Sequence, residues 1–416
     1  MIAIPDRIRR SAVVLAAVLG ALALGCGQGA GAPAALPSGS PTAARAVTGA
    51  EAARLLGAGC AAVMARDAGA WKAATPASGV AVRAALDRVY AHLAPLTWRG
   101  LRADATPVPR QPGVFDVRLV GALDPAGPPD RVAAELVLAF GRDGSGPFVA
   151  ADRTPKEVAV EGLLALQQPR ELRRAGCVVV FERTWRARAA GLAKLVPAAR
   201  AAVLRFYDLH DAAPLALFIY SSGSEVTDSV GMRPDQVDHR IKFFSHPVRR
   251  VAAKPWSPTD VGVVAPALIG QQAWAPTMLR HEIAHAFTLS WFFHTAHAPD
   301  FLQEGLAVAV EGSRSYAPLQ QDLLSGGPSI PLLSGMQTGD IWSGRSSDEV
   351  RLAYSEAGAT VLYVRERWGV TRLRRWVHEM ADCDQSDAAI KRVVRRDLGL
   401  SWPAFLRGWR AYVLSL

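Results

Sequence analysis

Residues 281–305 have the sequence HEIAHAFTLSWFFHTAHAPDFLQEG and hold four of the chain's nine histidines. His281 and His285 are four positions apart, so on a helix their imidazoles project from one face and can bind a single metal ion. Glu282 lies at the edge of that face, where its carboxylate can accept a proton from water without being a ligand itself. The surrounding segment APTMLRHEIAHAFTLSWFF, residues 275–293, is predicted to form one long helix.

Glu304 offers a third metal ligand. Eighteen residues separate it from His285, which is enough to end one helix, turn at an Ala-Pro pair and begin another helix. A catalytic zinc ion takes three protein ligands and keeps one position open for water or substrate. We therefore expect Glu304 to complete the set begun by His281 and His285. The alternative is that the two histidines form hydrogen bonds on an amphipathic helix and bind no metal.

The helix that carries Glu304 is predicted over residues 301–312, FLQEGLAVAVEG. Asp300 is expected to cap its N-terminus, and Gly312 is expected to end it. Glu311 lies two turns beyond Glu304 and is expected to be an exposed carboxylate outside the site.

The first 26 residues are typical of a lipoprotein signal peptide. Arginines near the start precede an apolar run at residues 11–25, and Cys26 follows it. This run is too short for a spanning helix, which needs about 20 residues. The cleavage region resembles a bacterial lipobox, in which the cysteine becomes the lipidated first residue. We therefore expect export and lipid anchoring at Cys26 on the extracellular side of the cell membrane, with ordinary secretion and an uncleaved anchor as alternatives.

The composition is that of a globular protein long enough for two hydrophobic cores, with 416 residues of which 50% are hydrophobic and 20% charged. The formal net charge is +10, but the basic residues are scattered along the chain. No basic-aromatic motif is present, so nucleic acid is not expected as a partner.

Cys60, Cys177 and Cys383 follow the predicted signal peptide, and none has CxxC spacing. A cysteine metal site is therefore not expected. Outside the cytoplasm two of the three can form a disulfide, which leaves one over, and all pairings remain open.

An α+β fold with two domains is predicted. The segments are the signal peptide at residues 1–26, a flexible Pro/Gly/Ser-rich linker at 27–48, a small α+β domain at 49–160 and a larger domain at 163–416. Strands are predicted at residues 113–123, 131–143, 146–152, 177–185 and 214–222, with an edge strand at 261–269. Helices are predicted between residues 49 and 93, at 186–209, and nearly throughout the chain from Glu349. The small domain resembles NTF2-like and cystatin-like modules and is expected to be a spacer or targeting domain.

The central motif has a family resemblance. HEIAH, the eighteen-residue gap and FLQEGLAVAVEG are similar to the gluzincin metallopeptidases, in which HExxH is followed by a ligand glutamate in a W/F-L-x-E-G-x-A setting. The closest likeness is to peptidase MA-like proteins of bacterial envelopes. It extends over about residues 177–413 and includes AYSEAGATVLYVRERWGVTRLRRWV in the helical C-terminal half.

This resemblance implies a zincin-like fold in which His281, His285 and Glu304 bind one Zn²⁺. It implies that Glu282 acts as the base and later as the proton donor. It also implies that Tyr354, in AYSEAG, hydrogen-bonds the developing oxyanion. The alternative for a tyrosine on a helix is core packing.

Two departures from the family pattern limit what the resemblance implies. The G-x-M-E-N motif by which gluzincin aminopeptidases hold a free amine is not present, which disfavours an exopeptidase acting at the N-terminus. Val308 stands four residues after Glu304, where thermolysin-type enzymes place an aspartate that orients a zinc histidine. The residue that orients His281 or His285 is therefore not identified by the sequence.

The expected function is zinc-dependent hydrolysis of peptide bonds in a peptide or protein substrate, as an endopeptidase at the cell envelope. Glu282 would assist the attack of water on the substrate carbonyl. One alternative is a catalytically inactive gluzincin-fold module for binding or assembly in the envelope. Another is a zinc hydrolase that acts on a non-peptide amide.

Overall fold

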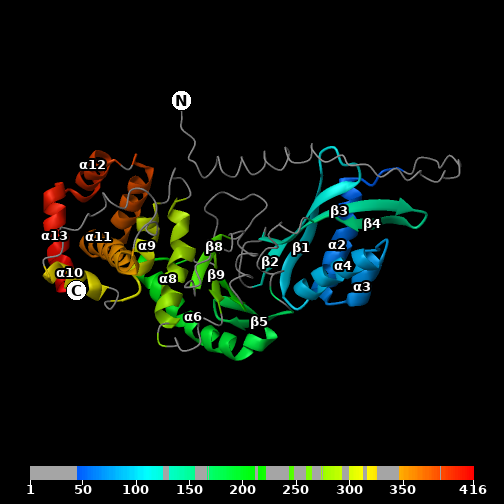
Figure 1. The fold of residues 1–416 in the computed structure, drawn as a ribbon, viewed down its shortest axis with the longest axis horizontal. Coiled ribbons are helices and arrows are strands. Elements are labelled where there is room, and N and C mark those ends of the chain that lie inside the picture. The colour runs from blue at the N-terminus through cyan, green and yellow to red at the C-terminus, as the bar shows by residue number, and fades with distance from the viewer. Residues whose placement is uncertain are drawn as a thin grey trace, which may run out of the picture. The chain divides into compact units, whose positions relative to one another are not determined.

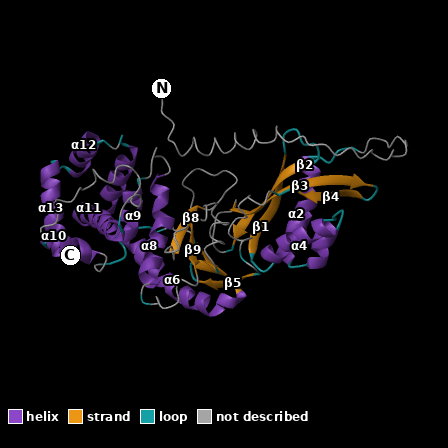
Figure 2. Cartoon of the chain, in the orientation of Figure 1, coloured by secondary structure: helices purple, strands orange, loops and turns teal. Residues whose placement is uncertain are grey.

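The computed structural model describes residues 45–124, 131–154, 166, 168–210, 214–221, 243–247, 259–264, 273, 275–292, 299–312, 316–325, 346–384 and 386–416. The predicted signal peptide, its Cys26 and most of the predicted linker lie outside these residues. Within the described part of the chain, every helix is too short or too polar to cross a membrane. Helices and two separate sheets build this part of the molecule (Figure 1, Figure 2), which confirms the predicted α+β class.

Three helices and a four-stranded antiparallel sheet form the first part of the fold. The helices are α2 (Gly49–Ala65), α3 (Ala68–Ala74) and α4 (Val80–Leu93), and the strands in spatial order are β1 (Trp98–Pro107), β2 (Val114–Leu123), β3 (Arg131–Asp143) and β4 (Gly146–Asp152). The three strands predicted in this region are confirmed as β2, β3 and β4. β1 is not evident from its sequence, WRGLRADATP, because its apolar alternation is weak. Its strand conformation is determined by antiparallel pairing with β2.

Five strands form the second sheet. In spatial order they are β5 (Pro169–Arg174), β6 (Cys177–Glu182), β7 (Leu215–Tyr220), β9 (Thr259–Val264) and β8 (Phe243–Pro247). β6, β7 and β9 are parallel, and β5 and β8 run antiparallel to their neighbours. The strand predicted at residues 261–269 is present as β9 up to Val264, and residues 265–269 lie outside the described part. Its predicted edge position is wrong, because β8 pairs with the outer side of β9. The parallel pair β6 and β7 is joined through a short turn, η1 (Arg183–Trp185), and the crossover helix α6 (Arg186–Tyr207).

Both faces of β6 and β7 are buried, which explains their unbroken apolar sequences. Odd-numbered residues such as Val179 and Leu217 belong to a core cluster with α6 and with the helices that follow the sheet. The even-numbered residues belong to a cluster with the first part of the fold, and they are Val178, Val180, Ala216, Phe218 and Tyr220. An apolar core therefore continues across the predicted boundary between the 49–160 and 163–416 domains, and Arg45–Leu416 forms one compact unit.

Helices dominate the rest of the described chain. They are α8 (Ala275–Thr288), η3 (Leu289–Phe292), α9 (Asp300–Val308), α10 (Ala317–Leu324), α11 (Ser347–Asp382), α12 (Asp387–Leu398) and α13 (Trp402–Ser415). This confirms the predicted helical C-terminal half, although α11 leaves helical geometry at Gly369, where φ is 80° and ψ is 170°. The predicted cap of α9 is wrong. Pro299 is the N-cap, because its extended backbone (ψ 131°) makes Asp300 the first helical residue, and the helix ends at Val308 rather than at Gly312.

Two glycines allow α9 and α11 to pack closely. A Cβ on Gly305 would lie 2.8 Å from the carbonyl oxygen of Ala357, and a Cβ on Gly358 would overlap Cγ1 of Val308. The glycine that follows Glu304 therefore has a packing role. The close approach brings the first turns of α11 against the part of α9 that carries Glu304.

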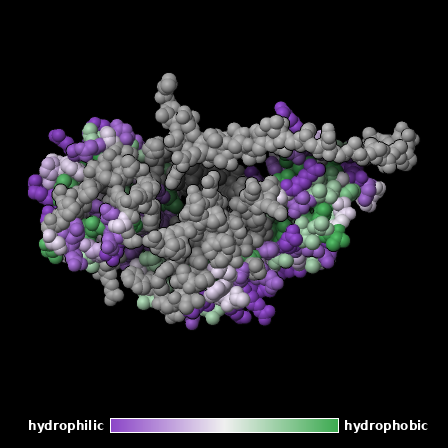
Figure 3. Space-filling view, viewed as in Figure 1, coloured by the Kyte–Doolittle hydropathy of each residue, from purple (hydrophilic) through white to green (hydrophobic). Residues whose placement is uncertain are grey.

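The described surface around the C-terminal helices is largely hydrophilic (Figure 3). Large apolar side chains that are exposed in the described part lie on four different helices, and they are Met64, Val80, Leu324 and Leu414. Single exposed apolar side chains are normal on folded proteins, so these four do not indicate a docking surface.

Candidate metal centre

His281 and His285 lie on the buried face of α8, and Glu304 faces them from α9. The two histidines are 8% and 7% exposed, and their Nε2 atoms are 3.2 Å apart. Oε2 of Glu304 lies 3.2 Å from Nε2 of His281 and 3.5 Å from Nε2 of His285. The structure thus brings together the three residues predicted as ligands. Their ligand atoms all lie within 4.8 Å of one another, close enough to bind a metal ion.

The three separations fit a tetrahedral ion. Two ligand atoms bound to such an ion at about 2.0–2.1 Å lie about 3.3–3.4 Å apart, and the observed distances run from 3.2 to 3.5 Å. Oε2 of Glu304 is buried and has no well-aligned hydrogen-bond donor, although both imidazole nitrogens lie within 3.5 Å of it. A buried carboxylate oxygen needs an opposite charge or a hydrogen bond to compensate its burial. A metal ion bound by these three residues would interact with it directly.

Protons compete with a metal ion for these side chains. Burial by itself lowers the pKa of His281, but the carboxylates of Glu304 and Glu311 outweigh it and raise this pKa well above its usual value. Burial raises the pKa of Glu304, whereas the nearby imidazoles of His285 and His281 hold it well below its usual range. The metal-free cluster therefore retains a proton that metal binding must displace.

Glu311 orients His281, although the sequence predicted an exposed carboxylate at this position. This prediction is wrong, because the Glu311 side chain is only 10% exposed and its Oε1 lies 2.6 Å from Nδ1 of His281. A carboxylate at this distance accepts the Nδ1–H hydrogen bond, which leaves the Nε2 lone pair of His281 free for a metal ion. Helical spacing from Glu304 does not reveal this role, because α9 ends at Val308 and Glu311 follows in a turn.

Val308 cannot take this role, because the contact between α9 and α11 requires an apolar residue there. Its side chain is 2% exposed and lies directly against Gly358. Glu311, three residues later, supplies the carboxylate that contacts His281.

Tyr354 of α11 and Glu282 of α8 complete the surroundings of the cluster. The Tyr354 ring lies nearly parallel to that of His281, with centroids 6.3 Å apart and an interplanar angle of 26°. Burial, followed by the charges of Glu304 and Glu282, raises the pKa of Tyr354 well above its usual value, so the phenol stays protonated and can donate a hydrogen bond. Glu282 is 7% exposed. The catalytic roles of Tyr354 and Glu282 stay predictions.

No disulfide joins Cys60, Cys177 and Cys383, the three cysteines of the described chain. Cys60 and Cys177 are fully buried in two different core clusters, so they cannot reach each other. Burial raises the pKa of Cys60 to about 12, which keeps this thiol protonated. The Cys383 thiol donates a weak hydrogen bond to the carbonyl of Met380. The disulfide that the sequence permitted does not form among these residues.

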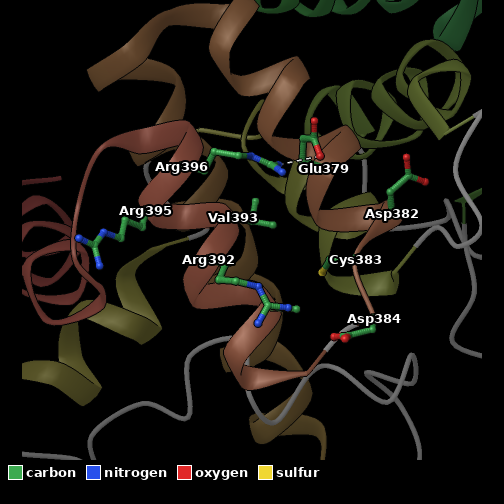
Figure 4. A pocket seen from close by; sticks show the side chains of 9 residues that line it. Glu379, Asp382, Cys383, Asp384, Arg392, Val393, Arg395 and Arg396 are labelled. Atoms are coloured by element: carbon green, nitrogen blue, oxygen red, sulfur yellow. Dashed lines mark ion pairs between the residues drawn. The ribbon is translucent and has the colours of Figure 1, made fainter.

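A separate cavity of about 540 Å³ lies where α11 ends and α12 begins (Figure 4). It is lined by Glu379, Asp382, Cys383, Asp384, Ala389, Arg392, Val393, Arg395 and Arg396. Arg396 pairs with Glu379 at 2.6 Å and with the buried Asp397 at 2.8 Å. None of the metal-site residues lines this cavity, so the cavity does not belong to the metal centre. The acidic and basic side chains of its lining are equal in number and neutralise one another.

Comparison of the chain with protein-family models gave no match. Comparison with curated proteins also gave no match. What the site can do therefore follows from its residues and their geometry.

Proposed function

We propose that this protein is a zinc-dependent metallopeptidase of the gluzincin type. The observation that carries the proposal is the convergence of His281, His285 and Glu304 at separations of 3.2–3.5 Å. Two imidazoles and one carboxylate on two helices suit zinc in a catalytic site, where a fourth position stays open. When bound, zinc supplies Lewis acidity that polarises a carbonyl and makes water more acidic.

Glu282, Tyr354 and Glu311 would have different roles in peptide hydrolysis. Glu282 would accept a proton from the attacking water and pass it to the leaving amine. Tyr354, whose pKa is raised well above its usual value, would donate a hydrogen bond to the oxyanion that develops on the substrate carbonyl. Its position beside the His281 ring supports this role. Glu311 would hold His281 in the tautomer that binds metal.

The proposal extends to fold family and location. The second sheet with α8, α9 and the helical C-terminal half would form a zincin-like peptidase part, and the first sheet with its helices an NTF2-like or cystatin-like part. Export with a lipid anchor at Cys26 would place the site outside the cell, where a peptide or protein is the substrate. An endopeptidase is preferred because the chain has no G-x-M-E-N motif.

Metal analysis combined with a cleavage assay tests this function. The purified protein should contain one zinc ion per chain and cleave an unfolded test protein. Glu282→Gln should retain zinc but lose turnover, by about 10²-fold or more, because a general base is removed without changing the ligands. His285→Ala should lose zinc and activity together.

The alternatives give different results. A catalytically inactive binding module would contain zinc, but any cleavage would be the same in the wild type and Glu282→Gln. A hydrolase of non-peptide amides would leave the unfolded protein intact and show Glu282-dependent turnover of small amide substrates. Zinc that stays bound in His285→Ala would remove the proposed ligand set.

A further inference from the structure

Arg280 precedes the first metal-ligand candidate in the sequence and contacts the segment that orients it. Nη2 of Arg280 donates a hydrogen bond to the main-chain carbonyl of Glu311. The same Nη2 lies 3.4 Å from Oγ1 of Thr277, one turn earlier on α8. Arg280 therefore connects α8, which carries His281, to the main chain of Glu311, whose carboxylate contacts His281.

Glu311 lies beyond the last regular turn of α9, so the helix alone does not fix its position. α9 ends at Val308, and the amide of Glu311 reaches back to the Val308 carbonyl in a tight turn with an N···O distance of 2.9 Å. Gly312 then has a φ of 117°. The last carbonyls of a helix lack partners within the helix. Arg280 satisfies the carbonyl of Glu311, and its positive charge is favourable at a helix C-terminus.

Glu311 is thus held at two points by neighbouring residues of α8. Its main-chain carbonyl accepts from Arg280, and its side-chain carboxylate accepts from Nδ1 of His281 at 2.6 Å. If the turn at Glu311 moved, the short contact with Nδ1 would be lost. The His281 imidazole could then rotate, or carry its proton on Nε2 instead of Nδ1, and Nε2 would no longer be available to a metal ion.

The geometry points to Arg280 as a positioning residue of the metal centre, which acts through Glu311 to fix the orientation and tautomer of His281. This inference rests on the proposed metal site. Within the described residues, the hydrogen bonds of Arg280 go to Thr277 and Glu311, so its contribution is distinct from that of the three ligands and of Glu282.

Arg280→Met tests the inference, because it keeps the apolar stem of the side chain and removes the donor. The chain offers a control in Arg365 of α11, whose Nε donates to the carbonyl of Phe206 at 2.8 Å near the end of α6. Zinc affinity is measured by competition with a chelator, and the stability of the metal-free protein by thermal unfolding. Arg280→Met should weaken zinc binding about 10-fold, as loss of support for a ligand typically does. Arg365→Met should lower stability but leave zinc affinity within about twofold of the wild type.

A double-mutant cycle shows whether Arg280 acts through Glu311. In a Glu311→Gln background, Arg280→Met should change zinc affinity by less than about twofold, because the contact it supports is already weakened. Nitrogen-15 NMR of the zinc-loaded protein should show a slowly exchanging proton on Nδ1 of His281 in the wild type and in Arg365→Met, and faster exchange of that proton with water in Arg280→Met. If Arg280→Met does not fold, Arg280→Gln replaces it in both measurements.

The outcomes separate this inference from the proposed function. Wild-type zinc affinity in the Arg280 variant, equal losses in Arg280→Met and Arg365→Met, or full additivity with Glu311→Gln would overturn the role of Arg280 alone. A wild-type protein that binds no zinc, or a His285→Ala variant that still binds it, would overturn the metal site itself.

Discussion

Gly305 of α9 lies directly against Ala357 of α11, where a Cβ on the glycine would be only 2.8 Å from the Ala357 carbonyl oxygen. The contact follows Glu304 by one residue, and on α11 it lies less than one turn from Tyr354. The packing of two helix backbones therefore sets the distance between a predicted metal ligand and a predicted catalytic tyrosine. Several consequences of this arrangement can be measured.

Gly305→Ala should weaken both the fold and the metal site. The added methyl group forces α9 away from α11, at a cost of about 1–3 kcal/mol in the free energy of unfolding. Zinc affinity should also fall, because Glu304 moves with the helix. Gly191→Ala is the matched control, since Gly191 lies on exposed α6 surface and an added Cβ would have no atom within 4 Å of it. It should increase stability by about 0.5–1 kcal/mol. Equal stability of the two variants in urea unfolding would contradict the packing argument.

Val308→Asp should not restore the orienting carboxylate of thermolysin-type sites. The aspartate would be buried against Gly358 without a cationic partner, which destabilises a protein by about 3–5 kcal/mol. Val308→Ala removes the same methyl groups without adding charge and should cost about 1–2 kcal/mol. Both variants can be compared by denaturant unfolding. If Val308→Asp matches Val308→Ala in stability and rescues the zinc affinity of Glu311→Gln, this position accepts the carboxylate after all.

Metal removal should destabilise the protein. A ligand that binds only the folded state adds about 4 kcal/mol when its free concentration is about 1,000 times its dissociation constant. Chelation should therefore lower the melting temperature, and added zinc should restore it. His285→Ala should melt at the same temperature with and without the chelator. If neither zinc nor the chelator changed the melting temperature of the wild type, this result would argue against a metal centre in the folded state.

A chain that starts at residue 163 should not fold cooperatively. Truncation exposes one face of β6 and β7, including Phe218 and Tyr220, which are 1% and 0% exposed in the full chain. Calorimetry of this shorter chain should show a broad or absent unfolding transition, and its zinc binding should be weak. A chain that starts at residue 45 should behave like the full protein in both measurements. A sharp transition with full zinc affinity in the shorter chain would favour two independent domains, as the sequence suggested.

Local sequence patterns predicted the elements whose own residues specify them. β2, β3, β4, β6 and β7 have strong apolar alternation or unbroken apolar runs, and α8 carries the HExxH spacing on one helical face. β1, β5 and β8 have weaker patterns, because pairing with a neighbouring strand rather than their own side chains determines their conformation. The edge position predicted for β9 fails for the same reason, since β8 pairs with it.

The candidate site divides in the same way. His281, His285 and Glu304 were predicted because their spacing within two helices is a property of the local chain. The role of Glu311 was not, because it depends on where the end of α9 meets α8, which is a tertiary contact. The hydrogen bond from Arg280 to the main-chain carbonyl of Glu311 also depends on tertiary structure and could not be predicted from the sequence. Residues that support a site are thus harder to predict than the residues that form it.

The lack of a disulfide among Cys60, Cys177 and Cys383 has a practical consequence for making this protein. We therefore expect residues 45–416 to fold without an oxidant or a disulfide isomerase. Reducing agents in a purification buffer should leave the melting temperature unchanged. Cys60 and Cys177 are buried, so alkylating reagents should modify these two thiols only after the chain unfolds.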